Sequence, residues 1–299
     1  MISDLPHTPT AARRLLSLAG MTLACLLPLS AHAATSPAPG TVFKDCTDSC
    51  PEMVVLPAGT FTMGTPEGET GREPDEGPMH QVTFKHPVAI SRFQITAGEF
   101  DSYIRESGVK IANGDTRAGR ECVAGKPRYP QTPRQPAVCM DFNDAKDYVA
   151  WLSRKTGKNY RMVSEATREY AARAGSTGPF PFPMDEGKAY SIAKHANTYG
   201  PADGYSFTSP AGSYAPNAFG VYDMHGNVYE FVADCKHPDY VGAPTDGSAW
   251  IKDSTCQLRQ IRGNDWGEAP VFSRSGNRND IYPQTRGDWI GFRVERDLP

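Results

Sequence analysis

Apolar residues recur at helical spacing in three parts of the chain. The longest pattern covers residues 142–156, where Asn143 is placed to cap the first turn and Gly157 ends the segment. Its apolar face comprises Ala145, Tyr148, Val149 and Leu152. Residues 96–106 and 164–174 show the same spacing over a shorter length. The pattern therefore predicts two or three helices, all of them before residue 175.

Extended segments are short and are separated by turn residues. Residues 53–57 and 59–64 predict two strands joined at a Pro-Ala-Gly turn, residues 81–84 alternate polar and apolar side chains, and residues 88–90 continue an extended pattern. Beyond residue 176, aromatic-rich stretches alternate with Gly, Asn, Asp and Pro, and no helical spacing is visible. These features predict a mixed α+β domain that is rich in loops and has few helices.

The composition favours a turn-rich fold and narrows the choice of partners. The chain contains 28 glycines and 26 prolines among 299 residues, which favours short elements over a helical bundle or a long parallel sheet. The formal net charge is −3, and the sequence has neither a basic stripe nor a run of lysines. A nucleic acid is therefore not an expected partner.

The N-terminus has the three parts of an export signal. Arg13 and Arg14 precede an apolar run, and the sequence Ala-His-Ala before residue 34 supplies a cleavage site with small residues. The apolar run is short for a membrane span. We expect residues 1–33 to be removed, which leaves one domain at 34–299 in the periplasm without a stable membrane anchor. The paired arginines leave both the Sec and the twin-arginine route open.

Six cysteines remain after this cleavage, and an even number indicates disulfide bonds in an exported protein. Proximity along the chain favours three bonds, each of which closes one loop: Cys46–Cys50, Cys122–Cys139 and Cys235–Cys256. A metal cluster is the alternative. The chain has no repeated CxxC motif and no paired histidine nearby, so disulfides are the preferred interpretation.

The segment 217–231 (NAFGVYDMHGNVYEF) combines aromatic residues with oxygen-bearing groups in one short turn. Asp223 and Glu230 would supply carboxylates, and Gly226 and Val228 would supply backbone carbonyls. Carboxylates and carbonyls in flexible loops are the ligands that calcium prefers. The alternative is that these residues only shape a turn.

Six blocks of the sequence occur in the order found in the formylglycine-generating-enzyme superfamily, and the chain resembles its sulfatase-modifying-factor domain. The blocks are residues 53–64, 73–78, 90–99, 160–175, 220–231 and 291–293. The resemblance implies a compact variant of the C-type lectin-like fold, with little regular structure for its size. Residues 162–170 (MVSEATREY) depart from the family pattern, because Val163 and Ser164 stand where the family has Pro-Thr and Arg168 stands where it has a tryptophan.

The same resemblance implies two structural calcium ions. One site would be formed by Asp223, Gly226, Val228 and Glu230. The other would be formed by Asn197, Thr198, Asp203 and Tyr205. In this second site the Asn and Asp side chains and the Thr and Tyr backbone carbonyls would bind the ion. The two ions would tie together a half of the chain that lacks helices.

The copper-binding cysteines of the sulfatase-modifying members have no counterpart in this chain. Glu268 stands at the position of the first cysteine, Phe272 or Ser273 at the second, and no cysteine follows Cys256. Copper(I) requires soft thiolate ligands, so formylglycine generation by that mechanism is not expected. A non-haem iron site of two histidines and a carboxylate would have to assemble from histidines that show no paired motif.

Exported periplasmic members without these cysteines form another branch, which acts on a siderophore precursor in the maturation of pyoverdine. The chain resembles that branch in its export signal, its size and its Gly-Asn-Asp-Trp sequence at 263–266. The resemblance implies an oxidoreductase that acts on the chromophore of a peptide siderophore precursor, or on another small peptide-like substrate. No redox-cofactor motif is visible. The oxidation would need oxygen alone, an unrecognised metal or an enzyme partner.

Residues for such an oxidation are expected in the segments 264–278 and 286–289. Glu268 would act as a base. Trp266 and Trp289 would stack on a flat chromophore, and Arg274 and Arg278 would bind acidic groups of the substrate. The alternative for each residue is structural. The tryptophans would then belong to the core, and the arginines would pair with Asp280, Asp288 or Glu295.

Two other functions remain open from the sequence. One is a non-catalytic, calcium-stabilised lectin-like module that binds a peptide or a glycan. The other is a formylglycine-generating oxidase with ligands other than cysteine, against which the missing cysteines argue.

Overall fold

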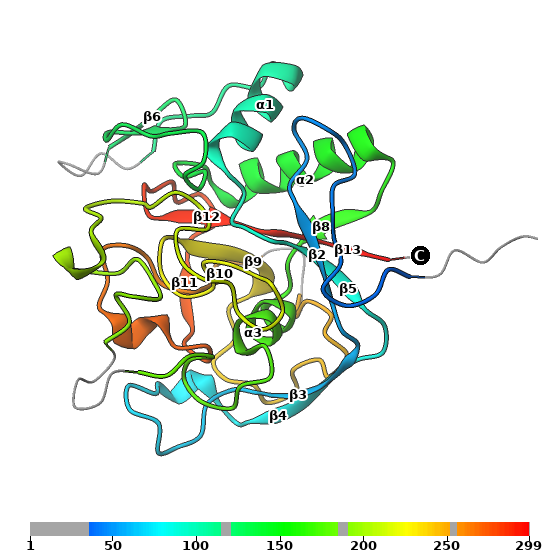
Figure 1. Cartoon of the computed structure of the whole chain (residues 1–299), viewed down its shortest axis with the longest axis vertical. Coiled ribbons are helices and arrows are strands. Elements are labelled where there is room, and N and C mark those ends of the chain that lie inside the picture. Colours follow the sequence, from blue (N-terminus) through cyan, green and yellow to red (C-terminus); the bar gives the residue numbers. More distant parts are fainter. Residues whose placement is uncertain (1–35, 115–120, 185–190, 252–255, 299) are drawn as a thin grey trace, which may run out of the picture. The chain divides into compact units, whose positions relative to one another are not determined.

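The computed structural model describes residues 36–114, 121–184, 191–251 and 256–298 (Figure 1). The predicted signal peptide at 1–33 lies outside these residues. The described part of the chain has no helix that is long and apolar enough to cross a membrane.

Short strands and a few helices make up the described chain, which confirms the predicted mixed α+β class. The helices are α1 (Ala97–Ser107), α2 (Phe142–Thr156) and α3 (Glu165–Arg173). The strands are β1 (Val42–Phe43), β2 (Met53–Leu56), β3 (Gly59–Met63), β4 (His80–Phe84), β5 (Val88–Ser91), β6 (Cys122–Val123), β7 (Lys126–Pro127), β8 (Tyr160–Met162), β9 (Tyr229–Cys235), β10 (Arg259–Arg262), β11 (Asn279–Ile281), β12 (Ile290–Phe292) and β13 (Val294–Asp297). Single 3-10 turns cover Pro74–Glu76, Pro201–Asp203 and Pro270–Ser273.

Two sheets contain most of these strands (Figure 1). The five-stranded sheet has the order β1-β2-β5-β13-β8 and is antiparallel throughout. The four-stranded sheet has the order β11-β10-β9-β12, and within it β12 runs parallel to β9. Strands β12 and β13 are separated by Arg293 alone and belong to different sheets. The end of the chain therefore joins the two sheets at Arg293.

The two strands predicted at 53–57 and 59–64 are present as β2 and β3, but they do not pair with each other. Strand β2 lies between β1 and β5, whereas β3 forms a hairpin with β4. All four residues of β2 are fully buried, so this strand belongs in the interior of a sheet. Strand β3 keeps an exposed side, as a strand at the surface does.

Helices α1 and α2 are both fixed by capping boxes. Thr96 caps α1, because its side chain accepts from the Glu99 N–H while the Glu99 carboxylate accepts from the Thr96 N–H. The predicted cap of α2, Asn143, is wrong. The cap is Asp141, whose extended backbone lets its carboxylate reach the Asp144 N–H at 2.8 Å. Gly157 ends α2 in the left-handed region, as predicted.

The helices pack on different parts of the core. Helices α1 and α2 share a cluster with β9, β12 and β13, in which Tyr148 lies edge-on to Phe292 with 5.3 Å between ring centroids. Helix α3 shares a second cluster with β2 to β5, where Tyr170 stacks on Phe84 at 4.8 Å. In Figure 1, α1 and α2 lie in the upper part of the picture and α3 in the lower part.

Helix α3 is buried along its whole length although it carries four charged residues. Arg262 of β10 bridges two of them, with Nη1 2.6 Å from Glu165 and Nη2 2.6 Å from Glu169. Arg173 pairs with Glu169 from one turn further along the helix, at 2.8 Å. Buried charges are tolerated when they are paired in this way, and the network ties α3 to β10.

The three predicted disulfides are all present. Cys46–Cys50, Cys122–Cys139 and Cys235–Cys256 have Cα–Cα distances of 5.4, 5.4 and 5.2 Å. The second bond lies within the irregular excursion between α1 and α2, where it joins β6 to the residues just before α2, and the third closes the loop between β9 and β10.

Candidate functional site

The segment that follows β10 holds most of the residues predicted to act in catalysis. Gly263 and Asn264 have φ angles of 100° and 71°, which turn the chain out of the strand. Asparagine is one of the few residues besides glycine that enters this region readily. The Asn264 amide then donates to the Ser273 hydroxyl at 2.8 Å and to the Ala269 carbonyl at 3.1 Å. These bonds close residues 264–273 into one loop.

Glu268, the predicted base, lies on this loop with its side chain exposed. Its backbone carbonyl accepts a hydrogen bond from the Tyr199 N–H at 2.9 Å, which fixes the loop against the segment around residue 199. The closed environment expected for a catalytic base is not present in the free protein. A bound substrate would have to cover Glu268.

Trp266 belongs to a group of three aromatic rings. Tyr129 and Phe207 stack face to face with centroids 4.4 Å apart, and Trp266 meets Phe207 edge-on at 5.2 Å. The Asp288 carbonyl fixes two of these rings, since it accepts from Trp266 Nε1 at 3.2 Å and from the Tyr129 hydroxyl at 3.1 Å. Phe207 is 39% exposed, so the group reaches the surface.

Trp289 is not a member of this aromatic group. Its ring packs edge-on against Tyr229 of β9, with centroids 5.9 Å apart. The Asp288 carbonyl, one residue before Trp289 in the chain, accepts the hydrogen bond from the Trp266 ring. The structure therefore brings Trp266 together with Tyr129 and Phe207, which sequence reasoning missed, and leaves Trp289 with the four-stranded sheet.

Arg274 and Arg278 do not face a cleft. Arg274 is buried against Glu76 at 2.6 Å and Glu69 at 2.9 Å, and Arg278 is buried against Glu165 at 2.8 Å. Burial lowers the pKa of Arg274, but the hydrogen bonds to Glu76 and Glu69 outweigh it and leave the pKa raised. In this structure both arginines serve as ion-pair partners within the fold, and the predicted substrate-binding role has no open surface to act through.

His225 lies inside the predicted calcium turn and is buried. Its Nδ1 is 2.6 Å from the Ser273 carbonyl, and its ring meets Phe180 and Phe182 edge-on at 5.3 and 5.5 Å. Burial lowers its pKa to about 4. His225 therefore stays neutral at ordinary pH and packs as an aromatic side chain.

The loop at 197–205 has a donor set that fits a calcium ion. Asn197 is 1% exposed, and its Oδ1 has no hydrogen-bond partner among the described residues. The Asp203 carboxylate accepts from two backbone groups, the Thr198 N–H at 2.8 Å and the Tyr205 N–H at 2.9 Å. A buried amide oxygen without a donor and a carboxylate in the same loop are two of the oxygen ligands that a calcium ion takes.

The turn at 223–230 is different, because most of its predicted ligand oxygens already have donors. Glu230 is fully buried and accepts from Arg168 and Arg293, and these two arginines keep its pKa low although burial alone would raise it. The residues present do not fit a dication here. Arg168 is the residue that departs from the family pattern, so the sequence carried the signal for this difference.

The described residues include no free cysteine whose thiolate could bind copper. Each of the six cysteines there is in a disulfide, and the same residues contain no group of three or more His, Cys, Asp or Glu side chains placed to hold a metal ion.

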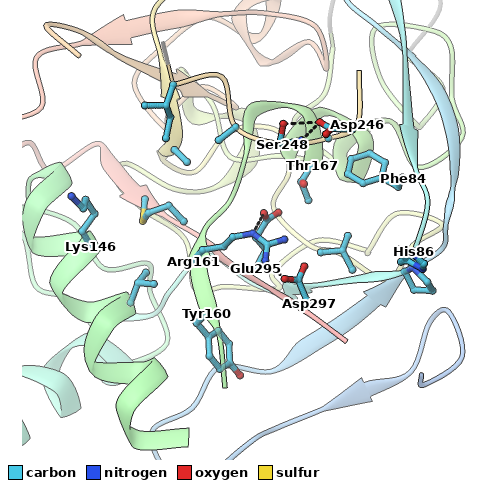
Figure 2. Close-up of a pocket in the computed structure, with 18 of the residues that line it drawn as sticks. Phe84, His86, Lys146, Tyr160, Arg161, Thr167, Asp246, Ser248, Glu295 and Asp297 are labelled. Atoms are coloured by element: carbon cyan, nitrogen blue, oxygen red, sulfur yellow. Dashed lines mark hydrogen bonds and ion pairs between the residues drawn. The ribbon is translucent and has the colours of Figure 1, made fainter. Parts of the chain in front are cut away.

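A cleft of about 810 Å³ opens between α2, β8 and the loop at 246–251 (Figure 2). Arg161 lies at its centre and pairs with Glu295 at 2.7 Å and Asp297 at 2.8 Å, while Lys146 stands on the α2 side. Its volume is that of a small-molecule site, but none of the site residues predicted from the sequence lines it. The lining of the cleft comes from many short segments of ordinary composition, so no local sequence motif predicted the cleft.

Comparison with known proteins gives one family. The model of the sulfatase-modifying factor enzyme 1-like domain matches residues 38–298. The chain is similar to the solved structure of PvdO from Pseudomonas aeruginosa, with 73% identity and a TM-score of 0.86 over 88% of this chain and 100% of that chain.

Two more distant relatives differ in their lengths. The inactive C-alpha-formylglycine-generating enzyme 2 of Bos taurus is 29% identical over 81% of this chain and 86% of its own length. The serine/threonine-protein kinase Pkn1 of Chlamydia trachomatis is 27% identical over 83% of this chain, and the match spans 38% of that protein.

Proposed function

Because the chain belongs to the sulfatase-modifying factor enzyme 1-like family, we propose that it is a periplasmic maturation enzyme that oxidises the chromophore of a pyoverdine-type siderophore precursor. The observation that carries this proposal is the 73% identity to PvdO over 88% of the chain, since we infer that PvdO and this chain both belong to the pyoverdine-maturation branch that the sequence resembles. The three disulfides are in keeping with an exported protein.

The surface for the chromophore would be the aromatic group of Tyr129, Phe207 and Trp266. A flat conjugated ring gains from stacking on such rings, and Phe207 is open to an incoming ligand. Glu268 lies two residues beyond Trp266 and would take a proton from the chromophore once the ligand has excluded water. The two electrons removed from the precursor need an acceptor, for which we propose dioxygen or a partner enzyme.

A deletion strain tests the proposal in the organism that carries this gene. We expect the strain to secrete a non-fluorescent, reduced precursor, and the wild-type gene to restore fluorescence. Normal fluorescent siderophore from the deletion strain would eliminate the proposed role. The precursor from that strain also serves as substrate for the purified protein, with oxygen uptake and absorbance as readouts.

The same assay separates an enzyme from a binding module. Turnover of the precursor with the purified protein supports an oxidoreductase. Saturable binding without any turnover, including after addition of periplasmic extract, would instead favour the non-catalytic lectin-like module.

A further inference from the structure

The Glu230 carboxylate lies between two buried guanidinium groups. Arg168 of α3 places Nε 2.7 Å from Oε2, and Arg293 places Nε 3.0 and 3.1 Å from the two oxygens. The side chains of Glu230 and Arg293 are fully buried, and that of Arg168 is 2% exposed. One negative charge is therefore shared by two positive charges in a site that water does not reach.

The Gln94 amide occupies the middle of the same turn. Its Nε2 is 3.0 Å from Glu230 Oε1, and it also faces three backbone carbonyls at 3.2, 3.3 and 3.5 Å, those of Val228, Asp223 and Gly226. The Asn227 amide donates to Gln94 Oε1 at 3.1 Å. The bond from Asn227 fixes the orientation of the Gln94 amide. If the Gln94 amide were reversed, its oxygen would face four other oxygens and its NH₂ group would face the NH₂ group of Asn227.

The two arginines also donate hydrogen bonds to backbone carbonyls of the turn. Arg168 Nη2 donates to the Met224 carbonyl at 2.7 Å, and Arg293 Nη2 donates to the carbonyls of Tyr222 and Asp223, the latter at 3.1 Å. The Asp223 carboxyl has a separate partner, since its Oδ2 accepts from the Gly212 N–H at 2.8 Å. Among the described residues, Asp223 Oδ1 has no hydrogen-bond partner, so this one predicted ligand oxygen is left for a cation.

We propose that Arg168, Arg293 and Gln94 hold the turn at 223–230 in place of a calcium ion. A dication needs several free oxygens and a site of net negative charge. Here the carboxylate and the carbonyls that would bind it face N–H donors. A dication at this point would also lie against two fixed guanidinium groups, and like charges in a buried site repel strongly.

The side chains that contact Glu230 come from three separate parts of the domain. Arg168 comes from α3, Arg293 from the junction between β12 and β13, and Gln94 from the segment between β5 and α1. Elements of both sheets thus meet at Glu230 through side chains. The stability of this junction then depends on the sequence and not on the supply of a metal ion.

Calcium titration of the Asp203→Ala variant tests the proposal, because that variant removes the other candidate loop. An ion that binds the native turn raises the Tm with its concentration. We expect the Tm of Asp203→Ala to be unchanged by calcium up to about 10 mM, compared with choline chloride at equal ionic strength. A calcium-dependent rise that disappears in the Asp203→Ala/Glu230→Gln double variant would overturn the proposal.

A second measurement uses the wild-type protein, so its result does not depend on whether a variant folds. Wild-type protein equilibrated with calcium and then desalted is analysed for metal per chain, and its ions are located by anomalous scattering in crystals. One ion at the 197–205 loop, or none, supports the proposal. An ion bound to Glu230 and the carbonyls of Gly226 and Val228 would refute it.

Discussion

Nη2 of Arg262 lies 2.6 Å from Oε2 of Glu169, and the two side chains are 1% and 0% exposed. The other arm of the same guanidinium reaches Glu165, also at 2.6 Å. A single residue of β10 thus bridges two carboxylates on the buried helix α3. Since the candidate loop begins directly after Arg262, this contact sets where the loop starts.

Replacing this arginine is expected to destabilise the fold severely. Arg262→Met removes one of the two arginines that the structure pairs with each of Glu165 and Glu169. Removing one partner of a buried ion pair costs about 3–5 kcal/mol. Urea unfolding of the purified variant measures the change. The control is Arg128→Met, whose exposed pair should contribute less than about 1 kcal/mol. Equal losses in the two variants would contradict the assigned role.

His225 predicts a specific pH dependence of stability. Its pKa is about 4 in the folded protein and 6.5 in the unfolded chain, so between these values the unfolded chain binds the extra proton. The contribution of His225 to the free energy of unfolding is therefore constant above pH 6.5 and falls as the pH drops towards 4, by about 3 kcal/mol in all.

The difference between wild type and His225→Phe isolates this contribution. Burial raises the pKa of Asp223 to about 6 and that of Asp234 to about 7, so these carboxyls favour the folded state as the pH falls and partly mask the histidine. Urea unfolding from pH 4.5 to 7.5 should give a wild-type-minus-variant difference that declines towards low pH. A flat difference would show that His225 is not held neutral.

The sequence predicted the structure best where a local signal decides it. It predicted the structure least well where the interacting residues are far apart in the chain. The helix at 142–156 and the three disulfides were predicted from spacing and proximity, and both are present. The cap was missed because Asp141 and Asn143 are equally suitable residue types, and only the extended backbone of Asp141 distinguishes them.

The candidate site was predicted only in part for the same reason. The sequence placed Trp266 and Glu268 on one segment, and the structure keeps them on one loop. It did not reveal that Arg274 pairs with Glu76, because these residues are 198 positions apart. Nor did it place Tyr129 and Phe207 beside Trp266, since tertiary packing alone brings them together.

A disulfide should contribute more to stability when the loop that it closes is longer, and the increase is logarithmic. Removing Cys122–Cys139, which spans 17 residues, with paired serine substitutions should cost about 3 kcal/mol. Cys46–Cys50 spans only 4 residues and should cost less when removed in the same way. Guanidinium unfolding of the two double variants under non-reducing conditions tests the order. The reverse order would mean that native-state packing, not loop closure, dominates.

The proposed function predicts different effects for different tryptophans. Trp266→Leu should lower the yield of fluorescent siderophore in a complemented deletion strain, because the stacking surface loses one of its three rings. Glu268→Gln should lower it while leaving the Tm unchanged, since that side chain is exposed. The matched control is Trp250→Leu, whose ring stacks on His237 at 3.6 Å, outside this aromatic group. Full fluorescence with Trp266→Leu and Glu268→Gln would exclude this loop from the reaction.

The loop at 197–205 is the place where we propose a structural calcium ion. Asn197 Oδ1 is buried without a hydrogen-bond partner among the described residues, an arrangement that costs free energy unless a cation or a water fills it. Chelator should therefore lower the Tm of the wild type. Asp203→Ala should lower it by a similar amount and abolish the response to chelator, because the carboxylate supplies the charge that holds the ion. If the wild-type Tm is the same in chelator and in excess calcium, Asn197 and Asp203 only shape the turn.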